Sequence, residues 1–181
     1  MINFKKNKNK GFTFIELMIV IFIMTVGITS IYTSITRIIS STTYSTLNLT
    51  ANYLAQEGIE IVKSIRDSNF LDYNYIITGT STSWKEGLSP GDYEADYNDY
   101  FLYSLQDNES RFLKVDEGDF FSYADNAFSV SPFKRKITIT ENPNNENVLN
   151  VSVTVYWTEK GKTNETTVSE NLYNLYPLSS I

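Results

Sequence analysis

The sequence predicts an α+β protein in which one long N-terminal helix packs against a C-terminal antiparallel β-sheet. Three observations predict this fold. An apolar run extends from Phe12 to about Ile39, a helical pattern of apolar residues continues to about Arg66, and strictly alternating segments follow residue 130. The helical and strand periodicities therefore occupy separate parts of the chain.

Residues 12–40 are expected to form a membrane-spanning helix. Roughly 20 apolar residues cross the hydrocarbon core of a bilayer, and this run is somewhat longer. Its hydroxyl side chains can bond back to the helix or across to neighbouring helices, and Gly27 is its weak point in helix propensity. Glu16 lies near the start of the run, where an unpaired carboxylate is costly. Glu16 is therefore a candidate functional residue that needs a partner.

Residues 41–67 are expected to continue the helix outside the membrane. Their apolar residues recur at three- and four-residue steps and form one face, while Glu57, Glu60 and Asp67 lie largely elsewhere. A helix from Phe12 to Arg66 would be on the order of 80 Å long. Gly58 lies on the apolar face, where the absence of a side chain would let a strand approach closely.

Residues 68–181 are expected to form a globular antiparallel β-sheet domain. Turn-forming residues at 142–145 and 159–162 separate three segments, which we expect to pair as antiparallel neighbours. Residues 69–125 are rich in aromatic and acidic side chains and are expected to hold short strands and long loops. The apolar side of the second of the three segments comprises Leu149, Val151, Val153, Val155 and Trp157.

Residues 1–11 have the pattern of a leader peptide whose removal would leave the apolar helix on the mature chain. Four lysines (Lys5, Lys6, Lys8 and Lys10) run directly into Gly11, whereas a secretory signal has its cleavage site beyond the apolar core. This order, with the sequence GFTFIELMIV, resembles the type IV prepilin leader. Type IV pilins, minor pilins, secretion pseudopilins and competence pilins share that leader. A plain signal anchor, oriented by the same lysines, is the alternative.

The resemblance implies roles for three residues. Gly11 would precede the bond cut by prepilin peptidase, and Phe12 would become the N-terminus that the same enzyme methylates. The carboxylate of Glu16 would meet the N-terminal amine of a neighbouring subunit as the filament assembles. An α-amine has a pKa near 8 and is largely protonated at neutral pH, so the two buried charges would neutralise each other.

The segment from Leu54 to Asp67, with the terminal strands, also resembles PilV-type minor pilins. The resemblance implies the type IV pilin fold and a structural subunit of a type IV pilus. Its partners would be prepilin peptidase, other pilin subunits in a helical filament, the inner-membrane assembly machinery and, before assembly, the lipid bilayer. The precursor would be a single-pass cytoplasmic-membrane protein with a cytoplasmic N-terminus, destined for a cell-surface filament or a periplasmic pseudopilus. The alternatives are a type II secretion pseudopilin and a tip adhesin or DNA-uptake receptor.

The composition argues against several classes of function. The chain has no Cys and no His, so disulfides and histidine chemistry are absent, and it has no phosphate-binding loop or nucleophile-elbow pattern. We therefore expect no catalytic residues and no enzyme. The formal charge of −6 becomes −10 without the four leader lysines. So acidic a domain disfavours nucleic acid as a partner, and the cluster Lys134-Arg135-Lys136 is expected to be a solvated face or edge protection.

Two features of the middle region leave alternatives open. Asp92, Glu94, Asp96 and Asp99 are weak candidates for calcium ligands, although their spacing does not match an EF-hand. No cofactor is expected, and a solvated acidic loop is the alternative to calcium. The aromatic residues are expected to fill a small core, with a binding surface as the alternative. They include Tyr73, Tyr75, Tyr93, Tyr97, Tyr100, Phe101 and Tyr103.

Overall fold

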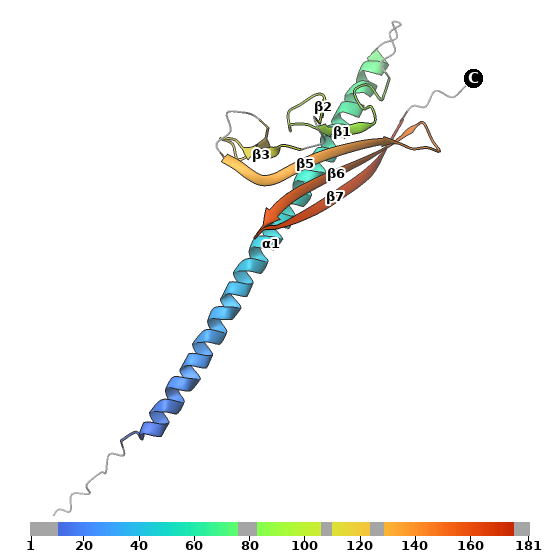
Figure 1. Cartoon of the computed structure of the whole chain (residues 1–181). Helices are drawn as coiled ribbons and strands as arrows, with labels where there is room; N and C mark the ends of the chain where they lie inside the picture. Colours follow the sequence, from blue (N-terminus) through green and yellow to red (C-terminus); the bar gives the residue numbers. More distant parts are fainter. Residues whose placement is uncertain (1–10, 76–82, 106–109, 124–128, 176–181) are drawn as a thin grey trace, which may run out of the picture. The chain divides into compact units, whose positions relative to one another are not determined.

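The computed structural model describes residues 11–75, 83–105, 110–123 and 129–175. The predicted leader lysines lie outside these residues. Within them the chain forms one helix, α1, and seven strands (Figure 1). The chain divides into two compact units, Met1–Tyr44 and Ser45–Ile181.

Helix α1 spans Phe14–Tyr75 without interruption, through Gly27. Thr13 caps its N-terminus, because the Thr13 hydroxyl accepts a hydrogen bond from the Glu16 N–H at 3.3 Å. The predicted C-terminal end near Arg66 was too early. Residues 68–75, which were expected in the globular domain, continue the helix instead.

The seven strands form one sheet. β5 (Ser129–Glu141) is its central strand: one edge pairs antiparallel with β6, and the other pairs first with β3 and then with β1. β7 pairs with β6, β2 with β1 and β4 with β3, all antiparallel. The other strands are β1 Gly91–Glu94, β2 Tyr103–Ser104, β3 Phe112–Val115, β4 Phe121–Ser122, β6 Val148–Glu159 and β7 Lys162–Tyr173.

The predicted antiparallel run of three strands is confirmed in β5, β6 and β7 (Figure 1). Lys160 and Gly161 form the tight turn between β6 and β7 with φ values of 51° and 80°, as a two-residue hairpin requires. The strictly alternating apolar residues of β6 are all buried. The short strands β1–β4, separated by loops, match the pattern expected for the middle region.

The core of the second unit lies between the sheet and the part of α1 that follows Ser45. Ala51, Leu54 and Val62 of the helix are buried in one cluster with Ile137 of β5 and Val153 of β6. Gly58 has the role expected from the sequence, because a Cβ atom there would lie 2.8 Å from Val153 Cγ1. One long N-terminal helix packed on an antiparallel sheet confirms the predicted α+β fold and its pilin-like architecture.

Candidate functional site

The predicted cleavage site lies immediately before the helix. Gly11 and Phe12 are exposed and non-helical, and Phe12 is 81% exposed. Among the described residues, no heavy atom beyond Gly11 and its chain neighbours lies within 4 Å of the position that a Cβ on Gly11 would take. The described backbone at this bond is therefore accessible and outside regular structure, as a peptidase substrate must be.

Glu16 occupies the first turn of α1, where its negative charge interacts favourably with the positive end of the helix dipole. The residues Thr13 to Glu16 also fit a capping box, in which a Thr at the N-cap is followed three residues later by Glu. This local role was not among the expectations drawn from the sequence, although the Thr-x-x-Glu pattern signals it. Glu16 remains exposed and close to Phe12 in the chain.

The first part of α1 presents an uncharged surface of membrane-crossing length. Leu17–Thr36 contains no charged residue, and its twenty residues span roughly 30 Å, the thickness of a hydrocarbon core. Its side chains are all exposed. Among the described residues, one helix is long and apolar enough to cross a membrane. Arg37 marks the end of the uncharged stretch.

The hydroxyl groups in this stretch bond back to the helix. Thr25 donates to the carbonyl of Ile21 at 2.8 Å, and Ser30 donates to the carbonyl of Val26 at 2.8 Å. These bonds satisfy the hydroxyl donors within the helix itself. The polar groups are therefore compatible with apolar surroundings. Hydroxyl groups of four further residues also donate to backbone carbonyls three or four residues earlier: Thr29, Thr33, Ser34 and Thr36.

The four calcium candidates have separate protein partners. Glu94 is buried and paired with Arg111 at 2.7 Å, whereas Asp92 accepts a hydrogen bond from Thr138 at 2.6 Å. Asp96 and Asp99 accept backbone N–H groups, from Tyr123 and from Asp96 itself. No group of three or more His, Cys, Asp or Glu side chains in the described part of the chain is placed to hold a metal ion. The structure thus does not bring these four carboxylates together as a cluster.

Arg135 corrects the expectation of a solvated basic cluster. Its side chain is 0% exposed and reaches from β5 to α1, where it donates to Glu57 at 2.8 Å and to the carbonyl of Leu54 at 3.1 Å. A third bond, at 2.7 Å, goes to the carbonyl of Ala95. The period of two along the strand could have revealed this burial, because Arg135 is in phase with Phe133 and Ile137.

The expectation that the middle-region aromatics fill the core is confirmed for Tyr93 and wrong for four others. Tyr97, Tyr100, Phe101 and Tyr103 are all exposed, and Tyr100 is 84% exposed. The side chains of Tyr73 and Tyr75 are not among those that the structure describes. Burial could not be read from these residue types alone, because Tyr97, Tyr100 and Phe101 lie in loops, which have no regular alternation of buried and exposed side chains.

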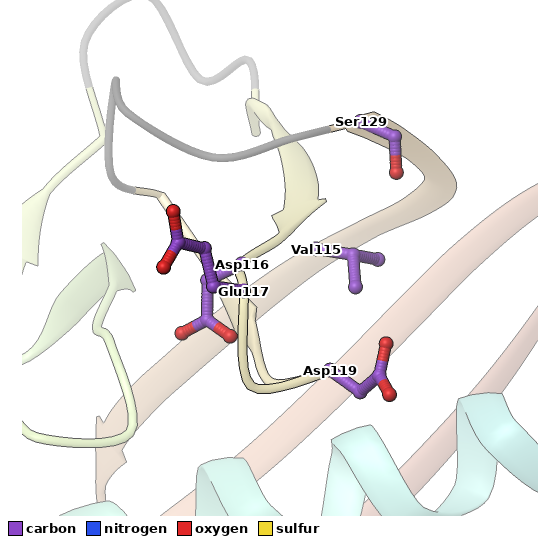
Figure 2. Close-up of a pocket in the computed structure, with 5 residues that line it drawn as sticks. All are labelled: Val115, Asp116, Glu117, Asp119 and Ser129. Carbon is purple, nitrogen blue, oxygen red and sulfur yellow. The ribbon is translucent and has the colours of Figure 1, made fainter.

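An open pocket of about 420 Å³ lies beside the turn that joins β3 to β4. Figure 2 shows the carboxylates of Asp116 and Glu117 on one side of this turn and that of Asp119 on the other. Asp116 shapes the turn by accepting the N–H groups of Gly118 and Phe120 at 2.8 and 3.0 Å. The remaining lining residues are Val115 and Ser129.

One comparison with known proteins matches the N-terminal segment. A family model described as the prokaryotic N-terminal methylation motif matches residues 6–32, which include Gly11, Phe12 and Glu16. No curated protein and no solved structure matches the chain. The motif indicates a type IV pilin or pseudopilin that prepilin peptidase processes, a structural rather than an enzymatic class. With the exposed apolar helix it fits a membrane-anchored precursor.

Proposed function

We propose that this protein is a minor pilin of a type IV pilus, of the PilV type, which enters the filament through the first part of α1. The observation that carries the proposal is the uncharged, exposed stretch Leu17–Thr36, which begins inside the methylation motif. An exposed apolar surface of this size needs a lipid bilayer or other protein chains around it. A subunit that moves from membrane to filament is surrounded first by lipid and then by other protein chains.

Maturation creates the groups that assembly uses. Cleavage between Gly11 and Phe12 removes the leader lysines and leaves the apolar helix attached to the domain. The new amine of Phe12 is largely protonated at neutral pH, and methylation keeps it basic. In the filament, Glu16 of one subunit pairs with this amine of a neighbour, so that neither charge is buried alone. Before assembly the precursor lies in the cytoplasmic membrane with the leader on the cytoplasmic side.

The first experiment tests processing. The protein is expressed with and without a prepilin peptidase, and its N-terminal peptide is analysed by mass spectrometry. We expect a chain that begins at Phe12 and carries one added methyl group, only where the peptidase is present. A chain that retains Lys5 to Gly11 in both samples would instead identify a plain signal anchor.

A second experiment separates charge pairing from helix capping at Glu16. Glu16→Leu removes the carboxylate, whereas Thr13→Ala removes the cap and leaves the carboxylate in place. We expect the Glu16→Leu subunit to be cleaved but absent from sheared filaments, and the Thr13→Ala subunit to be incorporated. Equal loss of both variants from filaments would assign the effect to the cap, and normal incorporation of Glu16→Leu would exclude charge pairing.

A type II secretion pseudopilin is the alternative that shares every residue of the N-terminal site. Deletion of the gene distinguishes the two, because loss of surface filaments supports the pilus and loss of protein secretion supports the pseudopilus. The exposed Tyr97 and Tyr100 are the observation that favours a tip adhesin. The acidic composition argues against a DNA-uptake receptor.

A further inference from the structure

A second open pocket lies on the face of the sheet that is opposite to the core. Along β5 the core-facing side chains are buried, whereas those that alternate with them are half-buried or exposed. The pocket has a volume of about 310 Å³ and is formed by residues of β3, β5, β6 and β7. We call it the sheet-face pocket. Its lining includes Phe112, Pro132, Lys134, Tyr156, Thr158 and Thr163.

The register of the strands brings these side chains together. Lys134 of β5 lies opposite Phe112 of β3 on one side and opposite Tyr156 of β6 on the other. Thr158 of β6 lies opposite Thr163 of β7. Directly opposite residues of antiparallel strands project their side chains from the same face of a sheet. The pocket is therefore built on paired strands rather than on loops, which holds its side chains in place before a ligand arrives.

Lys134 supplies a positive charge to the pocket. Its Nζ atom lies 4.6 Å from the ring centroid of Phe112, and that ring is 48% exposed. In the part of the chain that the structure describes, no carboxylate is paired with Lys134. Lys136, the next lysine on the same face, is instead paired with Asp92 at 3.4 Å. An anionic ligand can therefore reach the Lys134 ammonium without displacing an ion pair of the protein.

Three hydroxyl groups line the same pocket, from Tyr156, Thr158 and Thr163. Among the described residues, none of these hydroxyl groups has a hydrogen-bond partner. Thr154 and Thr167, further along the same two strands and outside the pocket, bond to each other at 2.9 Å. Each hydroxyl group can both donate and accept a hydrogen bond. Those of the pocket are thus available to a ligand that carries hydroxyl groups of its own.

The ring, the cation and the hydroxyl groups together indicate a class of ligand. A sugar has apolar C–H groups, which pack on the ring of Phe112, and hydroxyl groups, which need partners. A carboxylate on that sugar gives Lys134 its counter-charge. Nucleic acid fits less well, because its phosphates need a row of cations and Lys136 is already paired. The volume lies near the lower end of the range for ligand pockets, which suits one residue of a longer saccharide.

We propose that the sheet-face pocket binds a sugar residue that carries a carboxylate. The sugar ring packs on Phe112 and Pro132, its carboxylate pairs with Lys134, and its hydroxyl groups bond to those of Thr158 and Thr163. This gives the globular domain a saccharide-binding role that the N-terminal site does not require. The role goes beyond the proposed entry of the subunit into a filament.

The test measures binding to the full-length chain in a non-ionic detergent by isothermal titration calorimetry. Two probes supply the same chemistry from different sources, since a tetramer of galacturonic acid carries a uronate and sialyllactose carries a sialate. The methyl ester of each probe keeps the sugar and removes the charge, and a tetraglutamate peptide keeps the charge and removes the sugar. We expect at least one acidic saccharide to bind, and neither the esters nor the peptide. The tighter of the two acidic probes identifies the kind of sugar.

Variants of the pocket test each part of the proposed contact. Lys134→Gln and the double variant Thr158→Val/Thr163→Val should each raise the dissociation constant of the acidic saccharide by about tenfold. Phe112→Leu should raise it by about threefold. Valine has nearly the shape of threonine and a high preference for strands, so the double variant removes the hydroxyl groups while the sheet is retained.

Matched variants outside the pocket control for general effects. Lys85 also lies over an aromatic ring, with its Nζ atom 5.5 Å from the ring centroid of Trp84, and it does not line the pocket. Lys85→Gln should leave the dissociation constant unchanged. So should Thr154→Val/Thr167→Val, which removes two hydroxyl groups from the same strands.

Several results would overturn the proposal. These are no binding of either acidic saccharide, equal weakening by the control variants, and dependence on Lys134 without dependence on the two threonines, which describes simple ion pairing. Equal binding of the tetraglutamate peptide would assign the pocket to acidic peptides, and equal binding of the esters would assign it to neutral sugars. The assay needs neither cleavage at Gly11 nor assembly, so its failure and a failure of the proposed pilin role are distinguishable.

Discussion

At the level of single residues, Arg135 links the sheet to the helix. Its guanidinium is fully buried, and the carboxylate it contacts is that of Glu57, on α1. A buried cation is tolerated when it is paired and hydrogen-bonded, and here two backbone carbonyls add to the pairing with Glu57. Glu57 therefore has a structural role that its position on an amphipathic helix did not reveal.

We predict that Glu57→Ala lowers the free energy of unfolding by about 2–3 kcal/mol, because it leaves the Arg135 charge buried without its counter-charge. Glu60→Ala is the matched control, one helical turn further along. Glu60 is exposed and pairs with Lys63, so its removal should cost no more than about 1 kcal/mol. Denaturant unfolding of both variants measures the difference, and equal losses would contradict the assigned role of Arg135.

Tyr123 is a second residue whose environment has a measurable consequence. Burial raises the pKa of its phenol well above the ordinary value near 10.0, against the opposing effect of nearby Arg135. The folded state therefore favours the protonated phenol. The resulting stabilisation is complete below pH 10, where the unfolded chain is also protonated, and is lost as the pH rises further.

We predict that the free energy of unfolding falls as the pH rises above about 10 and that Tyr123→Phe makes this fall shallower. At neutral pH the variant should be less stable by about 1 kcal/mol, because the hydroxyl donates to the Arg135 carbonyl at 3.3 Å. Denaturant titrations at neutral and alkaline pH measure both effects. An unchanged slope in the variant would mean that other groups, such as Lys63, carry the alkaline loss.

At the level of elements, α1 has two different surfaces along its length. Before Tyr44 its described side chains are exposed except for the intermediate Ser40, whereas after Ser45 one face is buried against the sheet. The sequence predicts a change of this kind near residue 40, where the apolar run ends and the amphipathic period begins. It misplaced the helix end, since residues 68–75 continue the helix where Asn69 donates to the carbonyl of Glu86 at 2.8 Å.

Gly58 tests the contact between helix and sheet. We predict that Gly58→Ala destabilises the domain by about 1–2 kcal/mol, because the steric clash with Val153 exceeds the gain in helix propensity. Gly27→Ala should not lower the melting temperature, because no side chain of the described residues lies within 4 Å of the added Cβ. Val153→Ala should reduce the cost of Gly58→Ala in the double variant. A Gly58→Ala protein as stable as the original would show that the sheet can move away at little cost.

For the whole molecule, the boundary between units at Tyr44 separates apolar surface that stays exposed from apolar surface that is buried. All residues of the core cluster lie after that boundary. The first unit has no core of its own within its described residues, whereas the second has one without any disulfide.

We predict that a chain beginning at Ser45 folds by itself and stays soluble without detergent. Its melting temperature should lie within about 5 °C of that of the full-length protein in detergent, because no core residue is removed. Circular dichroism and size-exclusion chromatography measure the result. Loss of a cooperative transition would show that the first part of α1 contributes to the stability of the domain.

The sequence by itself determined the long helix, the three-strand sheet and the N-terminal motif, because each depends on local spacing along the chain. Periodicities of 3.6 and 2 residues and the order of lysines, Gly11 and apolar run are visible without knowing any distant contact. Only the tertiary structure decided that Arg135 is buried and that Tyr97 and Tyr100 are exposed. Burial depends on which elements cover a residue, and the covering elements here are separated from it by tens of residues, as Glu57 is from Arg135.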